Sequence, residues 1–312
     1  MVQIKRSVIQ IANSTQLISL PRKWSQKYGV KKGDELEIVE NGNKIFISTE
    51  RSAEAENLEI TPPHLKNITE RFVTASYRSG CKEVKVAFDK EANSGLLEYI
   101  HQKMDDQTIG YEVIKQDKDY CLIKDLSGAA TDEEFENALR RSFLLTTTMS
   151  KDILEALKRK DIEELKNMYF RDRSINKFTN YCARQLILKG YKNNKTTIFM
   201  YHFIRDFEAM ADQYSLMAVY YSSQPTKLSK EFLDSLQIAN DILAVYYELF
   251  YSFDKTKLNE LFEKIKSVNS KSLYKLKKID LVMVSYVDSV HRRLKELVDS
   301  LIELNLDKSS NN

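Results

Sequence analysis

The hydrophobic pattern changes its period twice within the first 50 residues. VIQIAN and TQLISL have the short apolar or alternating runs typical of strands, and Asn13-Ser14 lies between them as a turn. Pro21 suits the first position of a helix, so PRKWSQKYG predicts one or two helical turns that end at Gly29. DELEIV and KIFIS alternate on either side of an Asn-Gly turn signal, which predicts a hairpin. Residues 1–50 are therefore expected to form a β-rich unit, and the charged residues 51–60 a linker.

Residues 61–130 have a mixed pattern. Pro62-Pro63 opens the segment, and HLKNITERFVTASYRSG has helical spacing up to Gly80. KEVKVAF reads as a strand, NSGLLEYIHQKM as a helix that starts with a capping residue, and YEVIKQDKDYCLIKDL as two strands around a polar turn. The order predicts a small α+β unit with its helices on one face of a sheet.

Residues 131–306 have helical periodicity almost throughout. Thr131 and Glu134 form a capping-box signature at the start, Gly190 ends the second helix and Pro225 stops the third. A short fifth helix and a long sixth helix from Ser272 to Leu304, with a near-heptad apolar seam, complete the series. Six helices with short connections predict an all-α bundle of three plus three helices, and residues 307–312 a polar tail.

Composition narrows the functional classes. The 312 residues are 42% apolar and 30% charged, as in an ordinary soluble protein, and no run approaches a membrane span or a signal peptide, which predicts a cytoplasmic location. The three cysteines form no CxxC pair, and the four histidines have no HxxxH or HExxH spacing. Neither GxGxxG nor a P-loop occurs, and no nucleophile has a recognisable base nearby. We therefore expect no enzymatic activity.

Charge is distributed unevenly along the chain. Residues 1–33 contain seven cations and no acid, which leaves −4 for the rest because the whole chain carries +3. The cations are Lys5, Arg6, Arg22, Lys23, Lys27, Lys31 and Lys32. A basic module on a mildly acidic body indicates a polyanionic partner at one end of the protein.

The stretch from Ile18 to Val39 resembles the SpoVT/AbrB family of DNA-binding domains, to which MazE-type antitoxins also belong. The matching blocks are ISLPRKW and GVKKGDELEIV, with KIFIS as a closing strand, so the resemblance covers about residues 4–48. It implies a swapped-hairpin β-barrel that exists only as a homodimer. Independently, about 45 residues with a few short strands bury too little apolar surface to be stable alone.

The basic residues suit double-stranded DNA as a partner. Lys5, Arg6, Arg22, Lys23 and Lys27 are the candidate DNA contacts, and a dimer doubles each of them. Arg22 is the first choice for a base or phosphate contact because Pro21 fixes its backbone. Lys31 and Lys32 precede a turn and are expected to face solvent, and Trp24 is expected to pack inside the barrel. The alternative is a solvated charged face on a dimer that does not use DNA.

The helical part resembles the PhoU family of phosphate-uptake regulators, bundles of two three-helix repeats, over about residues 131–305. That family carries carboxylate pairs at i, i+4 on facing helices, which bind metal. Glu208 and Asp212 match one pair, and Asp172 with Asn176 in place of an acid stands on the partner helix. The resemblance implies that a divalent or iron-type cation would bind these four residues, Asn176 through its carbonyl oxygen. The alternative is that the carboxylates pair with arginines such as Arg171, Arg173 or Arg205.

The second repeat departs further from that pattern. Arg292 stands where an acid is expected, Glu296 remains, and Asp288 and Asp299 are nearby. An arginine there would supply positive charge itself and take the place of a metal.

The whole architecture resembles archaeal PhoU-type regulators. The first hypothesis is a DNA-binding transcriptional regulator with a helical sensor or interaction bundle, linked to phosphate uptake or homeostasis. The second is an adaptor whose head only dimerises and whose bundle binds a transporter ATPase or a kinase. An antitoxin is a third reading, although antitoxins usually add a short disordered tail rather than a structured body.

Overall fold

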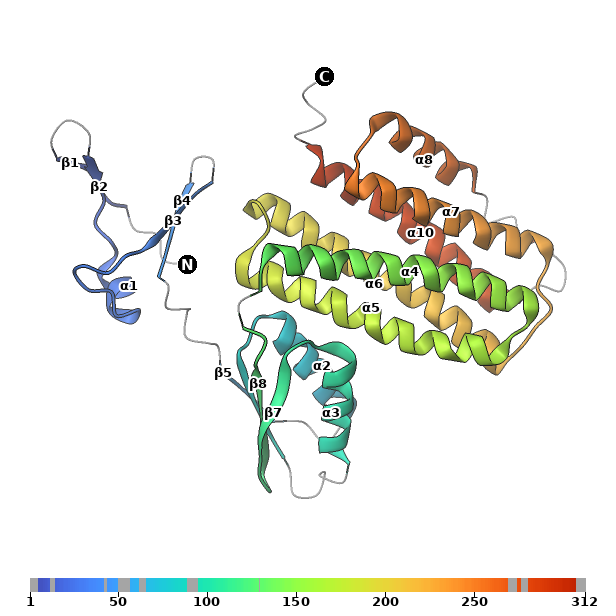
Figure 1. The fold of residues 1–312 in the computed structure, drawn as a ribbon, viewed down its shortest axis with the longest axis horizontal. Coiled ribbons are helices and arrows are strands. Elements are labelled where there is room, and N and C mark those ends of the chain that lie inside the picture. Colours follow the sequence, from blue (N-terminus) through green and yellow to red (C-terminus); the bar gives the residue numbers. More distant parts are fainter. Residues whose placement is uncertain are drawn as a thin grey trace. The chain divides into compact units, whose positions relative to one another are not determined.

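The computed structural model divides the chain into two compact units, residues 1–57 and 58–312. It describes residues 5–11, 15–41, 44–49, 57–61, 66–88, 95–128, 130–268, 274–275 and 280–306. Figure 1 shows a mixed α and β protein with a small N-terminal β region and a mostly helical C-terminal part. No helix in the described ranges is both long and apolar enough to cross a membrane.

The described residues of the first unit form two separate two-stranded antiparallel sheets and one short helix. Ile9 pairs with Leu17 in the first sheet, and Glu37 with Ser48 in the second. The elements are β1 (Ile9–Ile11), β2 (Thr15–Leu17), α1 (Arg22–Lys27), β3 (Glu37–Asn41) and β4 (Lys44–Ser48). The expected strands and hairpin are present, with β1 and β2 shorter than predicted. Both turns that connect the paired strands, Asn13-Ser14 and Gly42-Asn43, lie outside the described residues.

The first part of the second unit contains a four-stranded sheet in the order β5-β6-β8-β7. Its elements are β5 (Asn57–Ile60), α2 (Lys66–Arg78), β6 (Glu83–Ala87), α3 (Leu96–Gln107), β7 (Tyr111–Gln116) and β8 (Tyr120–Asp125). Val84, Val86, Cys121 and Ile123 alternate along β6 and β8 and share one buried core with α2 and α3. The helices therefore cover the face of the sheet to which these residues point.

Two local expectations in this region need correction. Residues 57–60, placed in the linker from sequence, form the edge strand β5, and Ile60 is buried in the sheet core. Gly95, in the left-handed conformation, precedes α3 and makes no side-chain cap. Asn93, the capping residue expected there, lies outside the described residues, as does Pro62-Pro63.

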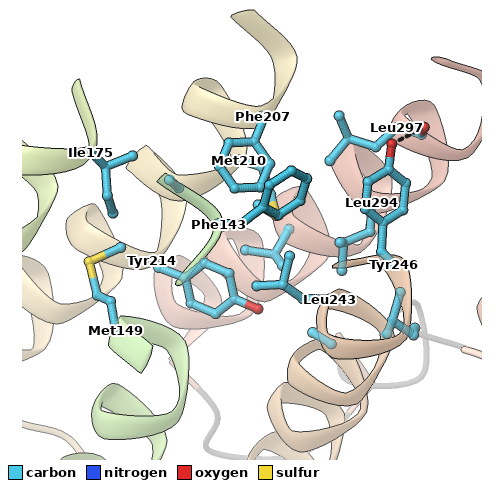
Figure 2. Packing of buried hydrophobic residues seen from close by; sticks show 14 of the residues in the cluster. Phe143, Met149, Ile175, Phe207, Met210, Tyr214, Leu243, Tyr246, Leu294 and Leu297 are labelled. Atoms are coloured by element: carbon cyan, nitrogen blue, oxygen red, sulfur yellow. Dashed lines mark hydrogen bonds between the residues drawn. The ribbon is translucent and has the colours of Figure 1, made fainter. Parts of the chain in front are cut away.

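The described helices of the bundle enclose one large apolar core. They are α4 (Asp132–Arg159), α5 (Ile162–Lys189), α6 (Asn194–Ser223), α7 (Lys230–Tyr251), α8 (Lys255–Ser267) and α10 (Leu281–Leu304). α6 packs between α5 and α10, α4 packs beside α5 and α7, and α7 contacts α10 and α8. Figure 2 shows side chains from several of these helices, among them Phe143, Phe207, Tyr214 and Leu294, pointing into the shared interior.

The ends of the helices follow local sequence signals. The capping box at α4 is present, with the backbone N–H of Glu134 donating to Thr131 Oγ1 and the N–H of Thr131 donating to Glu134 Oε2. Gly190 follows the last residue of α5 as predicted. The last helix starts later than expected, at Leu281, because the carboxylate of Asp280 accepts from the N–H groups of the first turn. The predicted tail, residues 307–312, lies outside the described residues.

Candidate nucleic-acid interface and carboxylate cluster

Helix α1 carries three exposed cations and two neighbouring aromatic rings. Pro21 is its N-cap rather than its first residue, and its carbonyl accepts from Ser25 N at 3.0 Å. Arg22, Lys23 and Lys27 are exposed. Lys23 and Lys27 lie four residues apart and share one face of the helix. The predicted contacts on α1 are therefore accessible to a polyanion.

The two aromatic residues of α1 and its C-cap pack against each other. The rings of Trp24 and Tyr28 are 5.5 Å apart, and Lys27 Nζ lies 5.2 Å from the centre of the Tyr28 ring. Trp24 is partly buried, as expected for a packing residue.

The cations outside α1 are also exposed. Lys5 and Arg6 precede β1, which begins at Ile9. Lys31 and Lys32 are exposed in the turn, where Lys31 N donates to Asp34 Oδ2 at 2.9 Å. Gly33 takes a φ of +95°, which favours glycine at this turn.

The apolar side chains of this unit are exposed as well. Seven large apolar residues have 45% to 66% of their surface accessible, and no side chain is buried among the residues up to Thr49 whose exposure the structure describes. They are Val8, Ile9, Ile11, Leu17, Ile18, Ile38 and Ile45. So much exposed apolar surface in so short a segment is typical of an interface that is incomplete in a single chain.

One family model matches this unit. Residues 9–55 match the family described as "Antidote-toxin recognition MazE, bacterial antitoxin". No curated protein matches the chain, and no solved structure does. The matched segment fits a DNA-binding or antitoxin-like regulatory domain, a type that is typically dimeric and binds nucleic acid.

The four residues predicted to bind metal lie together on two adjacent helices. Asp172 and Asn176 are on α5, with Asn176 Nδ2 at 3.5 Å from Asp172 Oδ2. Asp212, on α6, is hydrogen-bonded to Asp172, and Glu208 is close enough to both to repel them. Helical spacing on α5 and α6 thus brings the expected set into one cluster.

Burial changes the protonation of this cluster. Removal from solvent, together with the nearby Glu208 carboxylate, raises the pKa of Asp172 to about 6. Burial, Glu208 and Asp172 raise the pKa of Asp212 to about 7. The two carboxyl groups therefore favour sharing a proton over carrying two negative charges.

One carboxylate of this cluster already has a charged partner. Arg205 already pairs with Glu208 at 3.1 Å, as the alternative reading of this cluster expected. In the part of the chain that the structure describes, no three Asp, Glu, His or Cys side chains form a group that could hold a metal ion. Metal binding by these residues stays a prediction.

The second predicted cluster is dispersed. Arg292 is exposed and donates to Ser289 Oγ at 3.3 Å, whereas its neighbour Arg293 lies 3.5 Å from Glu296 and 3.4 Å from Asp206 on α6. Arg293 therefore makes ion pairs with acids on α6 and α10.

A polar network between the sheet part and α5 was not found from sequence. Arg184 is buried on α5 and donates to the carbonyls of Tyr77 and Cys81 and to the carboxylate of Asp125. Asn180, one turn earlier, accepts from Arg78 Nη1 at 3.2 Å. The sequence does show a charged residue, Arg184, inside an otherwise apolar helical stretch. It does not show the partners of this residue, because they lie far away in the chain.

Proposed function

We propose that this protein is a homodimeric, DNA-binding transcriptional regulator. The N-terminal unit would be the DNA-binding head, completed by a second copy as a swapped-hairpin barrel. The observation that carries the proposal is the combination, in one short unit, of exposed cations with exposed apolar residues. The match to an antitoxin-type family over residues 9–55 supports it.

Dimerisation and DNA binding are linked in this proposal. Covering the exposed isoleucines removes apolar surface from water, which favours association. The same step brings two copies of Lys5, Arg6, Arg22, Lys23 and Lys27 into one particle. Phosphate contacts from these residues would release counterions and make binding strongly dependent on salt.

The helical part is proposed to serve as a sensor or interaction module rather than as an enzyme. The order of its helices, with a short α8 in the fifth position, supports a relation to phosphate-uptake regulators and hence a role in phosphate homeostasis. A phosphate transporter ATPase or a signalling protein would then be its partner, and the protein would act in the cytoplasm.

DNA binding can be measured by fluorescence anisotropy on a labelled duplex from the protein's own promoter region. If the dimer neutralises about six phosphates, the log–log salt slope is about −5, so affinity should fall roughly 10³-fold between about 50 and 200 mM salt. Arg6→Ala/Arg22→Ala should weaken binding strongly. Lys31→Ala/Lys32→Ala removes the same charge from the turn and is the matched control.

The outcomes separate the two main hypotheses. A steep salt slope and a loss confined to Arg6→Ala/Arg22→Ala support a DNA-binding head. A flat salt response, or equal DNA binding by the wild type and this variant, would support the second hypothesis, in which the head only dimerises and the bundle acts as an adaptor. Sedimentation equilibrium of the same samples measures dimerisation separately.

A further inference from the structure

The first hairpin of the N-terminal unit has an apolar face and an amide face. In the antiparallel pair of β1 and β2, Ile9 lies opposite Leu17, and Gln10 lies opposite Gln16. Side chains alternate between the two faces of a strand pair, so Ile9, Ile11 and Leu17 share one face. The other face carries only Gln10 and Gln16 within the two strands, and all residues of β1 and β2 are exposed in the single chain.

The proposed dimer leaves the amide face accessible. A second copy would cover the apolar face, because burial of Ile9, Ile11 and Leu17 removes apolar surface from water. The two faces of a strand pair point in opposite directions, so the glutamines then point away from the covered side. Gln10 and Gln16 would therefore remain available to a ligand.

Charge distinguishes this hairpin from the second one. Residues 1–33 contain seven cations and no acid, and Lys5 and Arg6 come shortly before β1. Strand β3 of the second hairpin instead carries Glu37 and Glu40, which are both exposed and would repel phosphates. The first hairpin is therefore the one that a nucleic acid can approach closely.

Amides and cations make different contacts with DNA. Lys and Arg contacts to phosphates position a protein on the duplex but carry no sequence information, which is read at the base edges. A glutamine side chain matches the major-groove edge of adenine, because it offers one donor and one acceptor side by side. A two-stranded ribbon also fits into the major groove. Opposite residues of such a ribbon are about 5 Å apart at Cα, and successive base pairs are about 3.4 Å apart, so two opposite glutamines can reach neighbouring base pairs.

We propose that Gln10 and Gln16 read adenines in the major groove and so give the DNA-binding head its sequence specificity. Each side chain would donate from Nε2 to adenine N7 and accept at Oε1 from the adenine amino group. The cations would supply affinity through the phosphates. A second copy repeats the pair, so the recognised duplex should contain two half-sites related by a two-fold axis. This inference rests on the proposed function, since it requires the head to bind DNA.

The test starts from the full-length protein and a library of duplexes with a random central segment. Duplexes retained by the wild type should share A·T pairs in two symmetric half-sites. Fluorescence anisotropy on a selected duplex should show Gln10→Ala/Gln16→Ala binding at least about tenfold more weakly than the wild type. On a shuffled duplex the two proteins should bind equally and with the same salt slope, because the phosphate contacts are unchanged. Circular dichroism should show an unchanged fold, since both side chains are exposed.

A change in the DNA identifies the contacted atom. Replacing the adenines of the half-sites by 7-deazaadenine removes the N7 acceptor and keeps the base pairing. The wild type should lose about tenfold in affinity, whereas Gln10→Ala/Gln16→Ala should lose almost nothing further, because the contact is already absent. The matched control is Gln116→Ala/Gln237→Ala, which removes two exposed glutamines outside the N-terminal unit and should behave as the wild type.

The outcomes separate this inference from the proposed function. Absence of salt-dependent DNA binding by the wild type would overturn both. A steep salt slope without a shared sequence among the selected duplexes, or with the same sequence preference in Gln10→Ala/Gln16→Ala, would overturn the inference and leave the DNA-binding head standing. An equal loss on 7-deazaadenine by the wild type and the glutamine variant would also overturn the inference.

Discussion

Replacing Arg184 by methionine tests how the sheet part is attached to the helical bundle. The Arg184 side chain is 1% exposed, and its guanidinium lies 2.5 Å from the Tyr77 carbonyl, 3.0 Å from the Cys81 carbonyl and 2.6 Å from Asp125 Oδ2. It also lies over the rings of Tyr77 and Tyr111. Methionine keeps much of the volume but none of the donors.

The expected destabilisation follows from what the substitution leaves behind. Removing one partner of a buried ion pair costs about 3–5 kcal/mol, because the other charge stays buried without compensation. Asp125 still accepts from Ser127 N at 3.0 Å and from Ser127 Oγ at 2.6 Å, which reduces its penalty. We therefore expect the lower end of the range, about 3 kcal/mol. Arg184→Lys retains the charge but cannot reach all three acceptors, and should cost less than Arg184→Met.

The assay can separate the two units because the chain contains a single tryptophan, Trp24, in the N-terminal unit. Denaturant unfolding followed by circular dichroism at 222 nm reports on the helical unit, and Trp24 fluorescence reports on the head. Arg184→Met should lower the denaturant midpoint of the circular-dichroism transition and leave the Trp24 fluorescence transition unchanged. Combining it with Asp125→Leu should cost less than the sum of the single changes, since the double variant leaves no buried unpaired charge. A change below about 1 kcal/mol for Arg184→Met, or strict additivity, would refute the reasoning.

Two further changes probe buried polar groups of the bundle. Burial lowers the pKa of His291 to about 4, so the folded state resists a proton that the unfolded state binds below about 6.5. Between about pH 7.5 and 5 the free energy of unfolding of the wild type should therefore fall by about 2 kcal/mol from this group. His291→Gln lacks the titrating ring, so its loss over the same pH range should be smaller by about 2 kcal/mol in denaturant titrations at the two pH values. An equal loss in the two proteins would contradict the assignment. Asn240 accepts from Tyr214 Oη and donates to the Ser150 carbonyl, both at 2.9 Å, so Asn240→Leu should destabilise by about 2 kcal/mol. The exposed Gln237→Leu serves as its control in thermal unfolding and should be nearly neutral.

Features that depend on a few neighbouring residues could be predicted from the sequence. The capping box at Thr131, the helix end at Gly190 and the hairpin pairing of β7 with β8 all arise within short segments. Strand β5 was missed because its four residues follow a charged stretch and are stabilised by distant β6. Its local pattern alone is too short to distinguish a strand from a linker.

Long-range polar contacts could not be predicted for a related reason. Arg184 and Asp125 are 59 positions apart, and Arg78 and Asn180 are 102 apart. Periodicity shows that Arg184 falls within a helix, but it does not show which carbonyls and carboxylates the fold brings to that helix. The carboxylate cluster was found only because helical spacing places Asp172 with Asn176, and Glu208 with Asp212, on common faces.

The N-terminal unit shows why an apolar pattern predicts a buried face without saying which molecule buries it. The alternation in β1 to β4 is the pattern of strands with one covered side, yet Ile9, Ile38 and Ile45 are all more than half exposed in the single chain. The hydrophobic period of a strand reflects which side chains are buried in the assembled protein. The exposed surface of one chain reflects only the contacts within that chain. In the proposed function a second copy would cover these residues, at the segment where the cations are concentrated. An interface that covers these isoleucines must also increase the positive charge of the particle, so association and DNA affinity are expected to change together.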